Sequence, residues 1–429
     1  MMYKDNDFSR KGRIFGIMRR ILLLLLALAG AAPGLAAQPL PAPLTERTLR
    51  VDYIFSGTDK SCTIALDELG CLEGWAGRRV HLDELALHGN GQIRMHDAQT
   101  GRLLYCNSFS TLFQEWQATE EATRVQKSFE NVFLLPMPSV PVDVTVVLYD
   151  FHRQVSARLT HRVDPADILI RRLGSAPPAT RDILRSGSPQ ECIDVVILSE
   201  GYTAAEMETF YKDAAIAVES FMNHQVFSEL RDRFNFVAVA LPSAESGVSL
   251  PRRGDWKDTA LGSHFDTFYS DRYLTTLQLK RMHNLLAGIP YEHIIILANT
   301  DTYGGGGIFN SYTLTTAHHT SFRPVVVHEF GHSFGGLADE YAYDDQYEEQ
   351  YFPGIEPWEQ NITTLADFGS KWESMVGQEG VGLIEGAGYQ SKGVWRAAED
   401  CRMRTNAHPD FCPVCAEAIR RMVQFYTGK

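Results

Sequence analysis

Short runs of apolar residues, separated by turn-forming residues, characterise the chain between residues 46 and 165. Leu49 to Phe55 mixes apolar and polar positions, and Val132 to Leu135 and Val142 to Leu148 are further apolar or alternating runs. Alternation with a period of two is typical of strands that bury one face. The pattern predicts a β-rich region, which we interpret as a β-sandwich.

Strand and helix patterns alternate in the second half of the chain. Strands are expected over residues 192–198, 236–241, 293–298 and 308–316, helices over about 204–222 and 273–286, and a flexible loop over the glycines 304–307. Such alternation is typical of an α/β layer with a largely parallel sheet. The last strand leads directly into another helix, for which Ser321 is the expected N-cap.

Proline and glycine mark the boundary between the two regions, at Pro177-Pro178 and Gly187-Ser188-Pro189. Clusters of this kind are typical of loops and linkers. We therefore expect a β-sandwich domain over residues 38–165, a linker over 166–190 and an α/β domain over 191–429. A chain of 429 residues is long enough for two domains that each bury a core.

A basic and then strongly apolar segment precedes the β-rich region. Arg19-Arg20 are followed by the apolar run from Ile21 to Leu28, and small residues continue to Ala36-Ala37. This order is typical of a secretory signal peptide, here over residues 1–37. The apolar run is too short for a secure membrane span. We expect a secreted or periplasmic protein without stable membrane insertion once the leader is removed.

The formal net charge of −13 argues against nucleic acid or an anionic membrane as the main partner.

Seven cysteines in an exported chain predict disulfides with one sulfur left over, and Cys62 with Cys71 is the expected pair in the first domain. Three further cysteines gather near the carboxyl terminus around one histidine. There a disulfide is favoured over a structural zinc knuckle made of Cys401, Cys412, Cys415 and His408.

The helix that begins near Ser321 carries the candidate chemistry. It contains the HExxH sequence, from His328 to His332. Histidines four residues apart project from the same face of a helix, so both imidazoles can reach one metal ion. Glu329 can then lie beside a metal-bound water and take its proton. These residues predict one catalytic zinc ion, with His328 and His332 as ligands and Glu329 as the general base.

The turn after this helix offers a third ligand. Gly335-Gly336 can end the helix, because glycine accepts the left-handed conformation of a C-cap. Metzincin-type sites continue as HExxHxxGxxH, but the last position of that motif is Ala338 here, which cannot bind a metal. Asp339 can supply a carboxylate oxygen and is the expected ligand. Glu340 is the alternative, or else a residue that supports the site from behind its ligands.

Several stretches of the chain carry a family resemblance: HEFGHSFGGLADEY (328–341), WAG (75–77), FQEWQATEEA (113–122), DVVILSEGYT (194–203), ESGVSLP (245–251) and the C-terminal CRMR and FCPVC. Together they resemble the bacterial IgA-peptidase family of secreted zinc metallopeptidases. The resemblance covers nearly all of the chain after the leader. It implies a metzincin-like catalytic domain in which His328, His332 and Asp339 bind zinc and Glu329 is the base. It does not imply that immunoglobulin A is cleaved.

Further residues are candidates for supporting roles. The resemblance favours Met403 as the methionine of the metzincin turn beneath the metal over an ordinary core methionine. Apart from the resemblance, the hydroxyls of Tyr341 and Tyr343 make them candidate donors to the reacting carbonyl. The strand over 308–315 is expected to pair with the substrate backbone. The expected function is hydrolysis of peptide bonds in a protein or peptide substrate. An inactive zinc-containing protein that binds a glycan or a protein, and an amidase acting on cell-wall peptides, remain alternatives.

Overall fold

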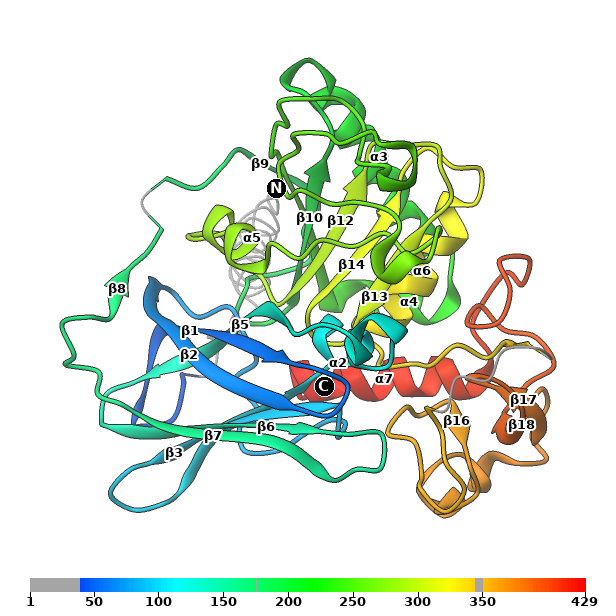
Figure 1. Cartoon of the computed structure of the whole chain (residues 1–429), viewed down its shortest axis with the longest axis horizontal. Helices are drawn as coiled ribbons and strands as arrows, with labels where there is room; N and C mark the ends of the chain where they lie inside the picture. Colours follow the sequence, from blue (N-terminus) through cyan, green and yellow to red (C-terminus); the bar gives the residue numbers. More distant parts are fainter. Residues whose placement is uncertain (1–38, 175, 344–349) are drawn as a thin grey trace, which may run out of the picture. The chain divides into compact units, whose positions relative to one another are not determined.

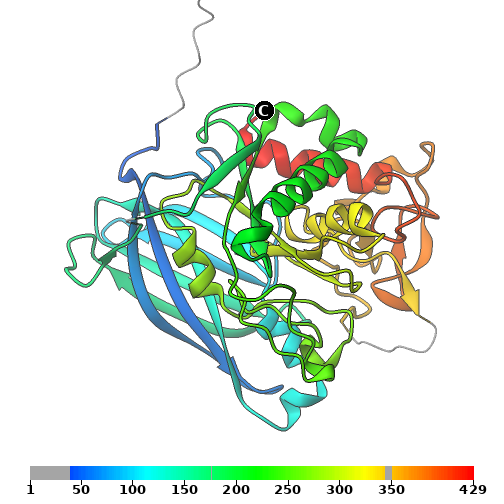
Figure 2. The ribbon, with the colours of Figure 1, turned by 90° about the horizontal axis from the view of Figure 1, so that it is seen from above.

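The computed structural model describes residues 39–174, 176–343 and 350–429, and Figures 1 and 2 show them in two perpendicular views. The leader predicted over residues 1–37 lies outside these ranges. Residues 39–429 form one compact unit. Within the described ranges, no helix has both the length and the apolar character needed to cross a membrane.

Two four-stranded sheets form the first part of the chain, where the alternating patterns predicted strands. Their strand orders are β5-β1-β2-β8 and β4-β3-β6-β7. The strands are β1 (Leu44–Gly57), β2 (Cys62–Glu73), β3 (Gly91–Asp97), β4 (Leu103–Phe109), β5 (Lys127–Pro138), β6 (Val142–Tyr149), β7 (Val155–Val163) and β8 (Arg171–Arg172), with helix α2 (Leu112–Gln117) before β5. Both sheets contribute to one hydrophobic cluster, in which Phe55, Val144 and Trp116 are fully buried.

A six-stranded sheet forms the second part, in the order β13-β14-β12-β10-β11-β9. Its strands are β9 (Thr180–Leu184), β10 (Ile193–Glu200), β11 (Phe234–Val239), β12 (His293–Ala298), β13 (Gly305–Ile308) and β14 (Tyr312–Thr316). The four inner strands run parallel, as the alternation of strands and helices predicted, and β9 and β13 lie antiparallel at the two edges.

Both faces of this sheet are covered, which explains why β10 is buried at every position. Val195 and Ile197 lie in a cluster with helices α3 (Met207–Met222), α6 (Phe322–Ser333) and α7 (Pro413–Thr427). Figure 2 shows these three helices on the same side of the sheet. Val196 and Leu198 point the other way and lie in the same cluster as the core of the first two sheets. The core is therefore continuous between the two parts of the chain.

Two predicted elements differ from the structure. The helix expected over residues 273–286 is only α5 (Leu279–Leu285), because the backbone of Arg272 and Leu274 is hydrogen-bonded to Gly305 of β13. The strand expected over 308–316 is a hairpin, with Asn310 in the left-handed region at its turn. As a result β14 lies inside the sheet and β13 is the edge strand. The prediction that residues 308–315 pair with substrate is therefore wrong for β14.

The remaining elements surround the carboxyl-terminal half. They are α4 (Gln225–Glu229) and a small sheet of β15 (Ala342–Tyr343), β16 (Ile362–Thr363), β17 (Ile384–Ala387) and β18 (Tyr389–Arg396).

All seven cysteines lie in described ranges and all are free thiols, so the predicted disulfides are not formed. Cys62 and Cys71 cannot be joined, since both belong to β2 and nine residues of extended strand separate them by roughly 30 Å.

Candidate metal centre

Helix α6 presents two histidines from one face. Pro324 lies in the first turn, where its missing N–H costs no helical hydrogen bond, and Val326 and Val327 bury the opposite face in the core. His328 Nε2 and His332 Nε2 lie 3.1 Å apart. The helix therefore places both Nε2 atoms where one metal ion could bind them.

Backbone carbonyls fix the orientation of the two rings. His328 Nδ1 lies 3.0 Å from Arg402 O. His332 Nδ1 lies 2.6 Å from Leu337 O. Because a carbonyl oxygen can only accept a hydrogen bond, each Nδ1 carries the ring proton and donates it. Nε2 of each ring is therefore the atom left to bind a metal ion.

Asp339 provides the third side of the cluster. Its Oδ1 lies 3.0 Å from His328 Nε2 and 3.3 Å from His332 Nε2. Gly336, with a φ of 59°, turns the chain back after the helix so that this carboxylate can return to the histidines. Oδ1 is buried and faces the two imidazole nitrogens. Three potential ligand atoms thus lie around a space that a cation would fill.

The electrostatics of the cluster also favour a cation. Burial alone would lower the pKa of His332, but the Asp339 carboxylate raises it to about 9. Burial would likewise raise the pKa of Asp339, but the two imidazoles hold it well below its usual range. The Asp339 carboxylate is therefore stabilised by positive charge beside it, which a bound cation would also supply.

The geometry fits a zinc ion. A tetrahedral zinc ion with bonds of about 2.0–2.1 Å separates its ligands by about 3.3 Å. The three ligand atoms of His328, His332 and Asp339 are 3.0 to 3.3 Å apart. Two imidazole nitrogens and one carboxylate oxygen also leave a fourth position open, as catalytic zinc sites do.

Glu329 lies on α6 beside strand β13. A Cβ atom placed on Gly305 would lie 2.8 Å from Glu329 Oε1, and one on Gly307 would lie 2.9 Å from His332 Cβ. The glycines, predicted from the sequence as a flexible loop, instead form a strand that approaches the helix more closely than any larger residue allows. Burial raises the pKa of Glu329, against the effect of the two imidazoles.

Met403 lies beneath α6. A Cβ atom placed on Gly331 would lie 2.6 Å from Met403 Sδ, so the methionine packs against the helix between the two histidines. Its side chain is fully buried, and its carbonyl accepts a hydrogen bond of 2.9 Å from Glu340 N. The segment that contains Met403 thus also supplies, through Arg402 O, the acceptor that orients His328.

Tyr389 contacts the outer oxygen of Asp339, and two further tyrosines pack against Tyr389. Tyr389 donates a hydrogen bond to Asp339 Oδ2. Tyr341 and Tyr343, the two sequence candidates, pack against Tyr389 with ring centroids 5.3 and 6.5 Å away. A hydrogen bond with Tyr343 also raises the pKa of Arg272. Sequence reasoning missed Tyr389, which lies fifty residues after Asp339 and outside any recognisable motif.

Glu340 does not join the histidines. Its Oε1 accepts hydrogen bonds from Asn361 Nδ2 and from Cys415 Sγ, both at 3.0 Å. The alternative ligand therefore lies with the C-terminal cysteines. His408, expected among those cysteines if they bound zinc, instead contacts Asp410 O through Nδ1 at 2.6 Å. Glu340 occupies the place that the sequence had suggested for this histidine.

The fold and the cluster together define a class of protein. An HExxH helix packed against an α/β sheet, with a carboxylate returning after its C-terminus, is the arrangement of a metal-dependent hydrolase. Comparison with family models identifies the family. Residues 182–380 and 377–423 match IgA Peptidase M64, and residues 42–160 match the Peptidase M64 N-terminus.

The peptidase match covers more than half of the chain, so the chain belongs to the IgA peptidase M64 family. The resemblance predicted from the sequence is confirmed, together with its order of an N-terminal region and a peptidase region. The family makes this protein a peptidase, a hydrolase of protein or peptide substrates. Among curated proteins, none matches the chain.

Proposed function

We propose that this protein is an exported, zinc-dependent endopeptidase. The convergence of His328, His332 and Asp339, whose ligand atoms all lie within 4.8 Å of one another, carries this proposal. Glu329 follows His328 directly on the same helix turn. The intact Glu329 argues against an inactive binding protein, which has no need of a general base.

Each residue of the cluster has a distinct proposed role. A zinc ion held by His328, His332 and Asp339 would polarise both a water molecule and the scissile carbonyl. Glu329 accepts the proton of the water as its oxygen attacks the carbonyl carbon, and then gives that proton to the leaving amine nitrogen. Burial, which raises the pKa of Glu329, suits it to hold the proton between these two transfers. Tyr341 and Tyr343 remain the proposed donors to the carbonyl oxygen.

The substrate is proposed to bind as an extended polypeptide along strand β13. This strand forms the edge of the sheet nearest α6, and an exposed edge can pair with a peptide backbone. Arg272 and Leu274 already occupy the backbone groups of Gly305. Gly307 lies two residues further along the same strand and next to His332. We therefore place the substrate backbone at Gly307.

The domain boundaries and the location belong to the same proposal. Residues 38–165 would form a β-sandwich, 166–190 a connection and 191–429 a metzincin-like catalytic domain, in keeping with family matches that end at 160 and resume at 182. Strand β9 lies inside this connection and pairs with β11, so the connection is tied to the catalytic sheet. Export rests on the leader-like sequence of residues 1–37.

A library of unstructured peptides tests the proposed activity. We expect cleavage at internal bonds, loss of cleavage after treatment with a zinc chelator, and recovery when zinc is restored. Cleavage that survives complete removal of metal would contradict the zinc mechanism. Failure to cut any peptide, with hydrolysis of cell-wall peptides instead, would favour the amidase alternative.

A further inference from the structure

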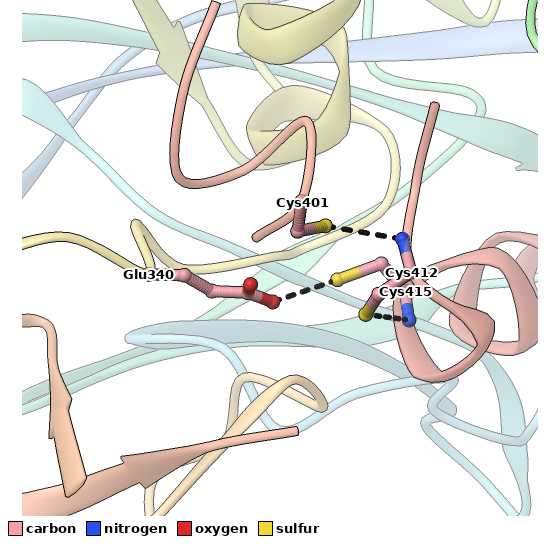
Figure 3. Close-up of side chains that lie close together, drawn as sticks. All are labelled: Glu340, Cys401, Cys412 and Cys415. Carbon is pink, nitrogen blue, oxygen red and sulfur yellow. Dashed lines mark hydrogen bonds between the residues drawn. The ribbon is translucent and has the colours of Figure 1, made fainter. Parts of the chain in front are cut away.

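A second cluster of metal-binding side chains lies behind the candidate catalytic site. It consists of Glu340, Cys401, Cys412 and Cys415, of which none is more than 3% exposed. Their ligand atoms all lie within 4.8 Å of one another. Figure 3 shows the carboxylate and the three sulfurs turned toward a common centre, although they come from three separate segments of the chain.

The local structure places the sulfurs as metal-thiolate sites do. Cys412 is the N-cap of α7, and its Sγ accepts a hydrogen bond of 3.5 Å from Cys415 N. Cys401 Sγ accepts one of 3.2 Å from Cys412 N. Backbone N–H groups at a helix N-terminus stabilise negative charge on sulfur. The Cys-x-x-Cys spacing also brings two sulfurs to the same side of the first helical turn.

Glu340 is the clearest sign that a ligand belongs there. Its Oε1 has Asn361 and Cys415 as partners, but its Oε2 is buried with no hydrogen-bond partner among the described residues. Leaving a buried carboxylate oxygen unsatisfied is costly, and such a group normally pairs with a cation or binds a metal. This oxygen belongs to the Glu340 carboxylate, which faces the three sulfurs.

We propose that Glu340, Cys401, Cys412 and Cys415 bind a second divalent ion of the zinc class, with a structural role. Three sulfur ligands select a borderline-soft metal such as zinc over magnesium or calcium. Four protein ligands complete a tetrahedral shell and leave no position for water, unlike the open site of His328, His332 and Asp339. The bound thiols lose their protons to solvent as the ion enters.

This ion would hold the catalytic ligands in place. Glu340 directly follows Asp339 in the chain, and Cys401 directly precedes Arg402, whose carbonyl orients His328. Glu340 N is also hydrogen-bonded to Met403 O at 2.9 Å. One ion therefore joins the segment after α6, the turn beneath α6 and the start of α7. We expect its loss to weaken metal binding at the histidines.

Metal content of the full chain tests the second site. Wild type should carry about two zinc ions per chain. The His328→Ala/His332→Ala variant should keep the ion bound by the cysteines, and Cys412→Ser/Cys415→Ser should lose it. Cys192→Ser is the matched control, because Cys192 is buried outside the cluster and should leave both ions in place.

Cobalt(II) gives a second readout that does not depend on whether the cysteine variant folds. The His328→Ala/His332→Ala variant loaded with cobalt should show the intense near-ultraviolet absorption of thiolate-to-cobalt charge transfer. The absence of this band would overturn the proposal. So would alkylation of denatured, unreduced wild type at two fewer than its seven cysteines, since that result would reveal a disulfide. Failure of the catalytic proposal alone would leave the cobalt band unchanged.

Discussion

Tyr389 is the residue on which the position of Asp339 depends most directly. It donates to Asp339 Oδ2 and leaves Oδ1 to the histidines. We predict that Tyr389→Phe lowers zinc affinity by about 10- to 100-fold, the usual cost of losing a hydrogen bond that orients a metal ligand. Competition with a chromophoric chelator measures this change.

Tyr211→Phe is the control for this substitution, because the Tyr211 ring lies on α3 against Arg181. It should leave zinc affinity unchanged. If Tyr389→Phe binds zinc as tightly as wild type, the hydrogen bond does not position Asp339 and the arrangement of the outer carboxylate oxygen needs another explanation.

Residues that act through local spacing could be predicted from the sequence, whereas residues that act through tertiary contact could not. The four-residue spacing of His328 and His332 already requires a shared helix face. Tyr389, the Arg402 carbonyl and Asn361 come from distant segments, and no local pattern marks them. Glu340 was named as an alternative ligand, but only the fold reveals that it turns toward the cysteines.

Among the elements, the close approach of β13 to α6 bears most directly on the proposed general base. We predict that Gly305→Ala keeps the metal but lowers kcat by about 100-fold, since a Cβ 2.8 Å from Glu329 Oε1 must displace this carboxylate by a fraction of an ångström or more. Turnover and metal content measured on the same preparation separate the two effects.

Gly382→Ala is the control for Gly305→Ala. A Cβ there would meet only Ala397 O, at an ordinary 3.8 Å, so activity should be kept. Loss of metal from Gly305→Ala would contradict a specific effect on Glu329, because it would mean that the whole helix had moved.

The buried strands of the sheet could be predicted more reliably than its edge strand β13 and the segment that pairs with β13. Continuous apolar runs identified β10 and β12 within one or two residues, because such strands are buried on both faces. The glycines of β13 carry no side chains and hence no periodic signal, so they were interpreted as a loop. The segment around Tyr273 was predicted as helix because its pairing with β13 is a tertiary contact.

At the scale of the whole molecule, the two parts of the chain share one core. Arg50 Nη1 donates to Asn284 Oδ1 at 2.6 Å, and Phe129 packs on Phe268 with ring centroids 6.5 Å apart. We predict that residues 182–429 expressed alone are insoluble or strongly destabilised, because α5 and the segment of Phe268 lose strand β5, against which they pack in the full chain. Thermal unfolding compares this fragment with the full chain. A soluble fragment with the Tm of the full chain would show that the parts are independent.

Acid should destabilise the molecule through His293. Burial lowers the pKa of this side chain to about 3, and its Nε2 has no hydrogen-bond partner among the described residues. In the unfolded chain His293 binds a proton near pH 6.5, whereas in the folded chain it stays neutral until the pH approaches 3. The free energy of unfolding therefore falls as the pH drops from 6.5 toward 3. The fall is about 1.4 kcal/mol per pH unit for this group.

His293→Phe should remove this contribution, since the site is already lined by Phe330, Phe334 and Tyr426. Urea unfolding at pH 7 and pH 5 gives the comparison. We expect the variant to lose less stability than wild type between these values. An equal loss in both proteins would mean that His293 becomes protonated in the folded state.

The most direct test of the proposed mechanism is turnover and zinc content measured together for wild type, Glu329→Gln and Asp339→Ala. We predict that Glu329→Gln keeps the zinc content of wild type and loses most of its peptide hydrolysis, while Asp339→Ala loses one zinc ion and its activity. Full activity in Glu329→Gln, or unchanged zinc content in Asp339→Ala, would contradict the roles assigned to these two carboxylates.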